Sequence, residues 1–548
     1  MLKLWTRLKH FFNIWSILSI IFVIGILLPN IDLLTHVFQK PNENWYHIQN
    51  YLLKDYIINT VKIVIPVAFL AMIIGTSIAW LISAYNFPFR KFFKWALVLP
   101  IAIPPYIAAY TYTGMLSYTG WIQSFIRNTL NLEVNAKYFD MMSIKGAIFI
   151  FTVGLFPYVY MITRAFLQNQ SASLIESARL LGRNSIEIFL YIVLPLCRGA
   201  IIGGTSLVIL EVLNDYGVVS YFGIPTLSTA IFKTWFGMGD IESAVKLSGI
   251  LMIFVLGILL VEIWLRGRKR YSYSTTKVRP IVRKELKGIY AGAAFMLCFI
   301  IISVGFVIPT LQLFQWSLLT YKKILNMEFV TLLFNSLWTA VIVSIIVVAM
   351  SIIIANFCRM QQGKFSKILS KITLLGYSIP AAVIAIGVIL FFVSLDNRLQ
   401  GVYKLFNQDS QTLVLSTSII MLLFAYIMRF LAIGYQSIEA GFEKVGKSFF
   451  EASRMLGKGV TETFFKVDLP MIKPAVLSAF ALTFVDVVKE LPLTLILRPF
   501  NFNTLATKTF EYANNEMIHE ASISSLLVII ISFISIYFLY RIEKEDNN

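Results

Sequence analysis

Two pairs of acidic residues lie within apolar stretches of the sequence, and their spacing gives them chemical interest. Glu211 and Asp215 form one pair, Asp486 and Glu490 form the other, and each pair is four residues apart. Residues four apart lie on one face of an α-helix, so each pair predicts a stripe of two carboxylates. Charged side chains deep in a membrane are costly and usually line a cavity or pair internally. Carboxylate oxygens are also the ligands that suit a hard cation.

An internal ion pair would explain these acids equally well, with Lys489 the nearest partner in the second pair. A position near the outer membrane surface, where water reaches, would also explain them. We expect no tight metal site, because a pathway that bound its cargo strongly would not release it. Any metal contact at these carboxylates would therefore be transient.

Prolines interrupt two of the apolar stretches, at Pro104, Pro105 and Pro380. Broken helices are common around transport pathways, although simple kinks in packed helices would give the same pattern. The candidate pathway residues are Glu211, Asp215, Asp486, Glu490, Pro105 and Pro380.

The stretch GFEKVGKS, residues 441–448, matches the nucleotide-binding pattern G-x-x-x-x-G-K-S. A phosphate-binding loop of that type needs a buried strand that delivers glycines and backbone N–H groups to the start of a helix. The preceding sequence FAYIMRFLAIGYQSIEA is instead a membrane span that runs into a polar helix. The stretch 275 residues earlier, FLQNQSAS, lacks the glycine and the lysine. We therefore expect no nucleotide site and no cofactor in this chain.

The elements that position these residues are membrane helices. Of the 548 residues, 58% are hydrophobic and only 14% are charged, which is too apolar for a soluble domain. Runs of about 20 apolar residues span the hydrocarbon core as helices, because lipid offers no partner for free backbone groups. About twelve such runs are found by this length criterion, at 12–33, 57–84, 94–116, 146–166, 198–222, 244–266, 288–314, 333–357, 370–395, 412–436, 473–497 and 522–541. The predicted fold class is an all-α polytopic membrane protein.

The formal charge of +18 follows the loops of this topology. Basic residues gather in alternate loops, and the segment 266–287 alone holds nine Lys or Arg against one Glu. The positive-inside rule then places both termini of this multi-pass membrane protein in the cytoplasm. Nucleic acid is not expected as a partner. The three scattered cysteines indicate neither a disulfide framework nor a zinc site.

The sequence contains an internal repeat, in which the second half of the chain resembles the first. Residues 176–198 read ESARLLGRNSIEIFLYIVLPLCR and residues 451–473 read EASRMLGKGVTETFFKVDLPMIK, and they align without a gap at an offset of 275. The same offset superposes the two acidic pairs and Pro105 on Pro380. Each half has about six spans by length, so the repeats are parallel and their interface is a natural place for a pathway.

The repeated segment is expected to form a helix–glycine–helix shelf on the cytoplasmic face. Glu176 and Arg179, like Glu451 and Arg454, are three residues apart and can pair on one helical face. Glycine then interrupts the helix, since it enters left-handed backbone geometry without steric cost. A proline follows where it can begin the next helix. A solvated loop would explain one such segment but not two with the same residues at the same spacing.

The pattern E-A-A-x-x-x-G, followed by I-x-L-P, resembles the signature of permease subunits in binding-protein-dependent ABC importers. In that family the segment is a coupling helix that inserts into the ATPase subunit. This chain departs from it by one Ser for Ala in each copy, ESA at 176–178 and EAS at 451–453, which we expect to alter a helix surface little. The stretch VKELPLTLILRPFNFNTLAT, 488–507, is similar to ferric iron importer permeases of the fused two-half type. The resemblance implies the coupling residues Glu176, Ala178, Arg179, Gly182, Pro195, Glu451, Ala452, Arg454, Gly457 and Pro470.

The expected organisation is a first permease half at 1–266, a basic cytoplasmic linker at 267–287 and a second half at 288–548. By resemblance, the partners are an ABC ATPase homodimer docked on 171–198 and 446–473, an extracytoplasmic solute-binding protein, and membrane lipid. ATP and Mg would be bound by the ATPase, and the outer loops 117–145, 222–243 and 498–521 would meet the binding protein. Ferric iron is the expected cargo. The same permease class carrying thiamine or an aminophosphonate, and a secondary transporter driven by an ion gradient, are the alternatives.

Overall fold

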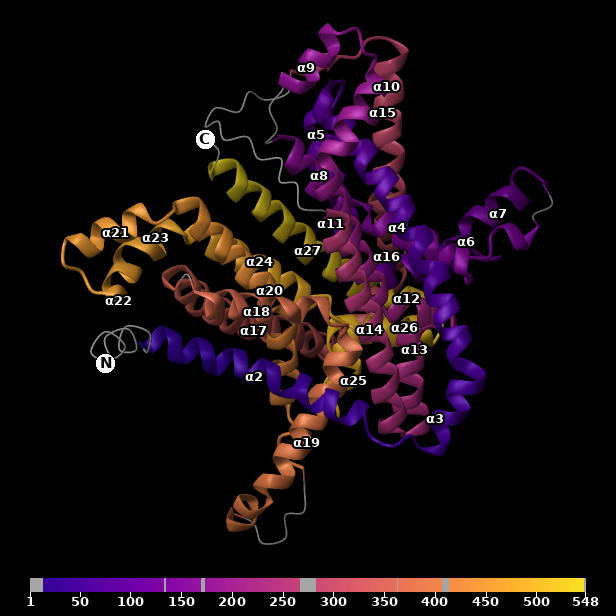
Figure 1. The fold of residues 1–548 in the computed structure, drawn as a ribbon. Helices are drawn as coiled ribbons and strands as arrows, with labels where there is room; N and C mark the ends of the chain where they lie inside the picture. Colours follow the sequence, from indigo (N-terminus) through magenta and orange to yellow (C-terminus); the bar gives the residue numbers. More distant parts are fainter. Residues whose placement is uncertain are drawn as a thin grey trace.

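The computed structural model describes residues 13–132, 135–168, 173–266, 282–361, 363–406 and 413–546, and these residues fold almost wholly as helices (Figure 1). The elements up to residue 266 are α2(Ile14–Val37), α3(Glu43–His47), η1(Ile48–Leu52), α4(Leu53–Ala84), β1(Tyr85–Asn86), α5(Arg90–Ala96), η2(Leu99–Ala102), α6(Pro105–Leu116), α7(Trp121–Asn128), η3(Ala136–Tyr138), α8(Ile144–Gln168), α9(Ser173–Leu180), α10(Ser185–Ile188), η4(Phe189–Val193), α11(Leu194–Asn214), α12(Gly217–Tyr221), α13(Leu227–Phe232), η5(Lys233–Gly237) and α14(Ile241–Arg266).

The elements after residue 281 are β2(Lys284–Glu285), α15(Ile289–Ile302), η6(Ser303–Val307), α16(Ile308–Ile324), α17(Met327–Met360), α18(Lys364–Ser378), α19(Ala381–Phe406), α20(Ile419–Val445), α21(Ser448–Met455), α22(Val460–Thr463), η7(Phe464–Asp468), α23(Leu469–Met471), α24(Lys473–Val488), α25(Pro492–Leu497), α26(Leu505–Asn514) and α27(Ile518–Asp546). The strands β1 and β2 are two residues each and pair in parallel. Most of the predicted linker, residues 267–281, lies outside the described residues.

The number of membrane helices agrees with the sequence prediction. In the described residues, ten helices are long and apolar enough to cross a membrane, and two further helix pairs qualify together although each is bent. The first bent pair, Arg90–Ala102 with Pro105–Asn128, turns by 89°. The second, Val460–Met471 with Lys473–Val488, turns by 73°. The predicted all-α polytopic fold with about twelve spans is confirmed.

Proline accounts for the breaks that the sequence predicted. Pro104 is the N-cap of α6 and Pro105 begins it, so the chain leaves η2 and restarts at an angle. Pro380 separates the end of α18 from the start of α19. Proline lacks an N–H and forces the preceding residue out of helical geometry. Each predicted span that contains these prolines is therefore two helices, and the run 370–395 becomes α18 and α19.

The two halves repeat specific hydrogen bonds as well as helices. Thr60 Oγ1 accepts from the Leu227 N–H at 3.1 Å, and Ser336 Oγ accepts from the Leu505 N–H at 2.7 Å. The helices that begin there, α13 and α26, both carry a threonine capping box. Equivalent residues thus fix equivalent helices, as a duplicated sequence requires.

The first helix of each half packs on the other half. Helix α2 lies against α17, α18 and α19 of the second half. Its Trp15 Nε1 donates to Thr461 Oγ1 at 3.3 Å, and its ring meets that of Phe464. Conversely, Phe295 of α15 contacts Phe89 and Phe93 of the first half. The two sequence halves are therefore interlocked rather than merely adjacent.

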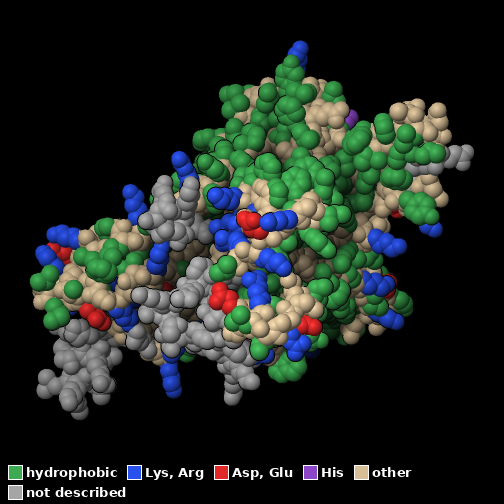
Figure 2. Space-filling model, turned by 90° about the horizontal axis from the view of Figure 1, so that it is seen from above, with side chains coloured by type: hydrophobic (Ala, Val, Ile, Leu, Met, Phe, Trp, Pro, Cys, Tyr) green, Lys and Arg blue, Asp and Glu red, His purple; other side chains and the backbone are tan. Residues whose placement is uncertain are grey.

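The helical bundle has two opposite ends. In Figure 1 the segments α9–α10 and α21–α23, the start of α2 and the end of α27 lie along the upper left, whereas α3, α7 and the far end of α19 lie along the opposite edge. Figure 2 shows a broad apolar surface on one face of the molecule, with Lys and Arg side chains gathered near its middle and on the lobe at the left. An apolar surface of this extent on the helices is what contact with lipid requires.

Candidate functional site

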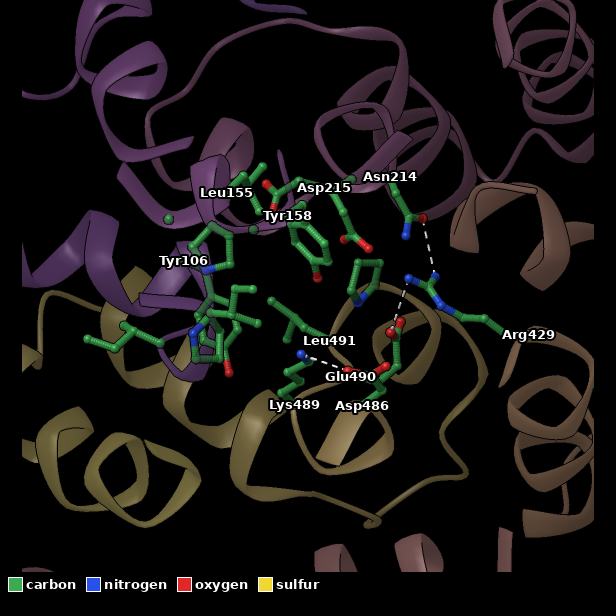
Figure 3. Close-up of a pocket in the computed structure, with 18 of the residues that line it drawn as sticks. Tyr106, Leu155, Tyr158, Asn214, Asp215, Arg429, Asp486, Lys489, Glu490 and Leu491 are labelled. Atoms are coloured by element: carbon green, nitrogen blue, oxygen red, sulfur yellow. Dashed lines mark hydrogen bonds and ion pairs between the residues drawn. The ribbon is translucent and has the colours of Figure 1, made fainter. Parts of the chain in front are cut away.

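A cavity of about 100 Å³ lies at the centre of the molecule, between the two halves. Figure 3 shows side chains from both halves pointing into it. Both predicted acidic pairs and one predicted proline line this cavity, namely Glu211, Asp215, Asp486, Glu490 and Pro105. Pro380 does not line it, although the N–H of the next residue, Ala381, donates at 2.6 Å to the side chain of Asn214, which does. Residues 275 positions apart in sequence therefore meet at one site.

The expected helical stripes are wrong for the second acid of each pair. Helix α11 ends at Asn214 and α24 ends at Val488, so the predicted spans 198–222 and 473–497 stop at the acids. Asp215 accepts from the Val218 N–H at 2.8 Å, and Glu490 accepts from the Leu493 N–H at 3.0 Å. Each carboxylate caps the short helix that follows, because the first N–H groups of a helix have no partner within it. The acids reach the cavity from helix ends rather than from one helical face.

Two basic side chains neutralise part of the acidic charge. Arg429 of α20 lies 3.4 Å from the Glu490 carboxylate, with both side chains at least nine-tenths buried. The same guanidinium donates to Asn214 Oδ1 at 3.2 Å and so joins the two halves. Lys489 pairs with Asp486 at 2.7 Å, so the ion-pair alternative for that acid is present. Four carboxylates face two cations, and the lining keeps an acidic excess.

Sequence reasoning missed Arg429, Asn214 and the three tyrosines of the lining, Tyr106, Tyr158 and Tyr377. Arg429 carried the same signal as the acids, a charge within the apolar run 412–436, and could have been found. At the position 275 residues earlier stands Gly154, which also lines the cavity, so only one half supplies this cation. Tyr377, which donates to Glu211, carried no distinguishing signal.

A second cavity, of about 360 Å³ and mostly apolar, adjoins the first. The two share Ile101, Tyr158, Tyr377, Asp486 and Lys489. From these residues the second cavity extends to Trp95, near the end of α5, and to Tyr540, near the end of α27. The cavities therefore follow one another along the bundle, with two tyrosines and an ion pair between them. In the described part of the chain, no group of His, Cys, Asp or Glu is arranged to hold a metal ion.

The repeated charged segments form two projecting shelves, α9–α10 and α21–α22. Gly182, at φ +79°, ends the first helix of one shelf, and Gly457, at φ +82°, ends that of the other. Both lie in the left-handed region predicted for them, where a side chain would be strained. Just before each glycine two apolar side chains face outward, Leu180 and Leu181 in one shelf and Met455 and Leu456 in the other. Leu180 and Met455 are each 89% exposed.

The predicted ion pairs within the shelves are wrong. The described residues record no pair between Glu451 and Arg454, and Arg454 instead donates to the Lys458 carbonyl. Arg179 likewise reaches the Val282 carbonyl at 3.4 Å rather than Glu176. The Lys458 carbonyl lies just beyond the end of α21, where backbone carbonyls have no helical partner and accept from such a guanidinium.

The acid that does pair in the second shelf is Glu462. Its carboxylate lies 2.7 Å from the ammonium of Lys458 and 2.9 Å from that of Lys466. These hydrogen bonds, first the one from Lys458 and then the one from Lys466, lower the pKa of the exposed Glu462 carboxyl to about 2.

The small residues of the motif hold each shelf together. Ala178 and Ser453 occupy the same position of the repeat and are both buried, so Ser453 does not lie on the helix surface as expected. Ser453 Oγ and Thr463 Oγ1 are hydrogen-bonded at 2.9 Å. The residue equivalent to Thr463 is Ile188, which is buried in the first half. The buried positions are thus occupied by the polar pair Ser453 and Thr463 in the second shelf and by the apolar residues Ala178 and Ile188 in the first.

The remaining motif residues differ in their exposure and in the geometry of the helices after them. Glu451, Ala452 and Arg454 are exposed, whereas Glu176 and Arg179 are half-buried. Pro195 lies at the start of α11, in one continuous helix from Ser185 to Asn214. Pro470 lies in α23, after which the chain bends by 73° before α24. The two shelves are thus joined to the central cavity by different connections.

Comparison with known proteins shows that one protein family matches this chain at two places. The family described as "Binding-protein-dependent transport system inner membrane component" matches residues 71–267 and again residues 347–543. Among similar proteins, Fe(3+)-transport system permease protein FbpB 2 of Haemophilus influenzae is 26% identical over 490 residues, 88% of this chain and 89% of that protein. Ferric transport system permease protein FbpB of Actinobacillus pleuropneumoniae is 24% identical over 407 residues, 71% of this chain and 56% of that protein.

Another relative is similar over a shorter stretch of the chain. Sulfate transport system permease protein CysT of Salmonella typhimurium is 25% identical over 207 residues, 37% of this chain and 72% of that protein. The full-length likeness and the half-length likeness agree with a chain made of two copies of one unit.

Proposed function

Because this chain belongs to the family of binding-protein-dependent transport system inner membrane components, we propose that it is the complete membrane pathway of an ATP-driven ABC importer for ferric iron. Residues 1–266 and 288–548 are the two permease halves, joined by a basic cytoplasmic linker at 267–287. The chain carries cargo and performs no chemistry of its own. An ATPase homodimer binds ATP and Mg, and an extracytoplasmic binding protein delivers the iron.

The single observation that carries the proposal is the acidic cavity at the interface of the two halves. Its four carboxylates come in equal number from both halves and outnumber the cations two to one. Such a lining attracts a cation and repels a dianion such as sulfate. Oxygen donors also match a hard trivalent ion. The names of the relatives that are similar over most of this chain support the same cargo.

Each carboxylate that would meet the cargo has an internal partner at present. Asp486 is paired with Lys489, Glu490 with Arg429, and Glu211 accepts from Tyr377. An entering cation would take over part of these contacts and return them when it leaves. This exchange keeps the carboxylates satisfied in the empty pathway and prevents a tight complex, which release requires.

The shelves are the docking surfaces for the ATPase, over residues 171–198 and 446–473. On each shelf the two exposed apolar residues directly before Gly182 or Gly457 form a small apolar surface, which a cleft on the partner would bury. Two shelves on one chain fit the two subunits of an ATPase homodimer. Both shelves and both termini then lie in the cytoplasm, as the distribution of basic residues also requires.

Stimulation of the ATPase tests the cargo. The chain, its ATPase and its binding protein would be reconstituted together, and ATP hydrolysis measured with the binding protein loaded with iron or with thiamine. Iron-loaded protein should stimulate hydrolysis and thiamine-loaded protein should not. Stimulation by the thiamine-loaded protein and not by the iron-loaded protein would identify thiamine as the cargo.

Variants separate the cavity from the rest of the acidic surface. Glu211→Gln with Asp486→Asn should abolish iron-dependent stimulation, because it removes two of the four cavity carboxylates. Glu242→Gln, an exposed acid outside the cavity, is the control and should leave stimulation intact. Equal loss in both would show that the cavity carboxylates have no special role.

A further inference from the structure

A third cavity, of about 790 Å³, lies at the shelf end of the second half, outside the central pathway. The end of α17, the first turns of α18 and the end of α20 surround it. Basic residues outnumber acidic ones four to two in its lining, with the cations Arg359, Lys367, Lys371 and Lys447 and the acids Glu439 and Glu443. Lys367 and Lys371 are four apart on α18 and present their ammonium groups on one face.

Arg359 has unused hydrogen-bonding capacity in this cavity. Its side chain is only 8% exposed and its Nη2 pairs with Asp468 at 2.6 Å. Its Nη1 is buried without a hydrogen-bond partner. A buried donor that stays unsatisfied is costly, particularly when it carries charge, so native proteins rarely leave one. An acceptor bound in the cavity would satisfy it.

The other half of the repeat shows that the fold does not require two of these cations. Helices α4 and α17 correspond at an offset of 276, as their matching hydrogen bonds and the two family matches show. At that offset Ser83 stands for Arg359 and Trp95 for Lys371, whereas Lys91 stands for Lys367. Arg359 and Lys371 are therefore additions made to one half only.

We propose that this cavity binds a phosphate group, either the head group of an anionic phospholipid or a free phosphate compound. Ammonium and guanidinium groups are the usual ligands of phosphate in proteins. The hydroxyl of Ser370, which also lines the cavity, is a further possible donor. Basic pockets between helices at this level of a membrane bind lipid head groups.

This site is not a nucleotide-binding loop, although Gly446 and Lys447 of the stretch GFEKVGKS line it. Helix α20 continues to Val445, so no strand delivers backbone N–H groups to a phosphate. Side chains hold the anion instead.

The site is next to the second shelf. The guanidinium of Arg359 lies 4.9 Å from the ring of Phe450 in α21 and is paired with Asp468 in η7. A phosphate on Arg359 would thus touch a residue that contacts both α21 of this shelf and η7 directly after it.

Cys358 supplies a native probe, since it lines the cavity, whereas Cys197 and Cys298 are fully buried. The full-length chain, purified free of phospholipid, would be labelled with a small methanethiosulfonate. One arm adds inorganic pyrophosphate, and two others use nanodiscs of phosphatidylglycerol or phosphatidylcholine. Slower labelling with pyrophosphate assigns a soluble ligand, and slower labelling in phosphatidylglycerol alone assigns a lipid. Labelling that neither pyrophosphate nor phosphatidylglycerol slows would overturn the proposal.

Matched variants locate the effect. Lys367→Gln with Lys371→Gln should raise the ligand concentration that gives half-protection at least about tenfold, since each basic residue near the surface contributes to anion binding. Lys91→Gln with Lys364→Gln removes the same charge from exposed positions outside the cavity and should leave protection unchanged. Equal loss of protection in both double variants would mean that the cavity is not the binding site.

Discussion

Removal of the Arg429 charge should destabilise the whole protein. Arg429 and Glu490 are 3.4 Å apart with side chains 8% and 5% exposed, so Arg429→Met would leave a buried carboxylate whose remaining donor is the Leu493 N–H. Breaking a buried pair in this way costs about 3–5 kcal/mol. The unfolding entropy of 548 residues is about 1.2 kcal/mol per degree at ~2.1 cal/mol/K per residue.

The expected fall in Tm is therefore at least about 3 °C. It is a lower bound, because helices that persist in detergent reduce the entropy gained on unfolding. The fall would be followed by intrinsic tryptophan fluorescence in detergent. Arg429→Met with Glu490→Gln should recover most of it, because the second change removes the charge that the first leaves unpaired.

A control compares the more exposed pair. Lys489 and Asp486 are each 21% exposed, so Lys489→Met should cost less than Arg429→Met. A double variant at Arg429 and Glu490 that is no more stable than Arg429→Met would refute the reasoning, since the loss would then come from packing and not from an unpaired charge.

Further predictions concern the second shelf. Met455→Asp with Leu456→Asp should reduce the ATPase that co-purifies with the chain at least about tenfold, because docking would then bury two unpaired carboxylates; unchanged co-purification would contradict the docking assignment. Gly457→Ala should lower the stability of the shelf by about 1–2 kcal/mol, because a φ of +82° strains any residue with a side chain. Limited proteolysis should therefore cut the shelf faster in Gly457→Ala than in the control Gly459→Ala, where φ is −66°. The pKa of Glu462 is lowered to about 2, so its pairs stabilise the shelf above the ordinary carboxyl pKa and are lost only as pH falls through about 2. Glu462→Gln should therefore speed proteolysis of the shelf equally at pH 5 and pH 8, and an effect that vanishes at pH 5 would contradict this.

The features that sequence predicted well are those set by composition and by the repeat. Apolar runs predicted the membrane helices because the hydrocarbon core leaves the backbone few options. Prolines marked the breaks beside Pro105 and Pro380 because they cannot donate a helical hydrogen bond. The offset of 275 brought Glu211 and Asp486 to one cavity, since equivalent residues of parallel repeats face a common axis.

The features that sequence missed depend on local competition between partners. Asp215 and Glu490 looked helical by spacing, but each caps a new helix, which needs a break that an apolar run hides. Arg454 was expected to pair with Glu451 on its own helix, but it donates to the Lys458 carbonyl. Helices α2 and α15 each pack on the opposite half through contacts between residues far apart in the sequence, and no residue pattern predicted this packing.

The most direct test of the account is uptake of radioactive iron by vesicles that contain the chain. Uptake is expected only when the ATPase, ATP inside the vesicle and the iron-loaded binding protein outside are all present, and it should be lost in Glu211→Gln with Asp486→Asn. Uptake by the chain alone, driven by an ion gradient without ATPase or ATP, would contradict it and would identify a secondary transporter.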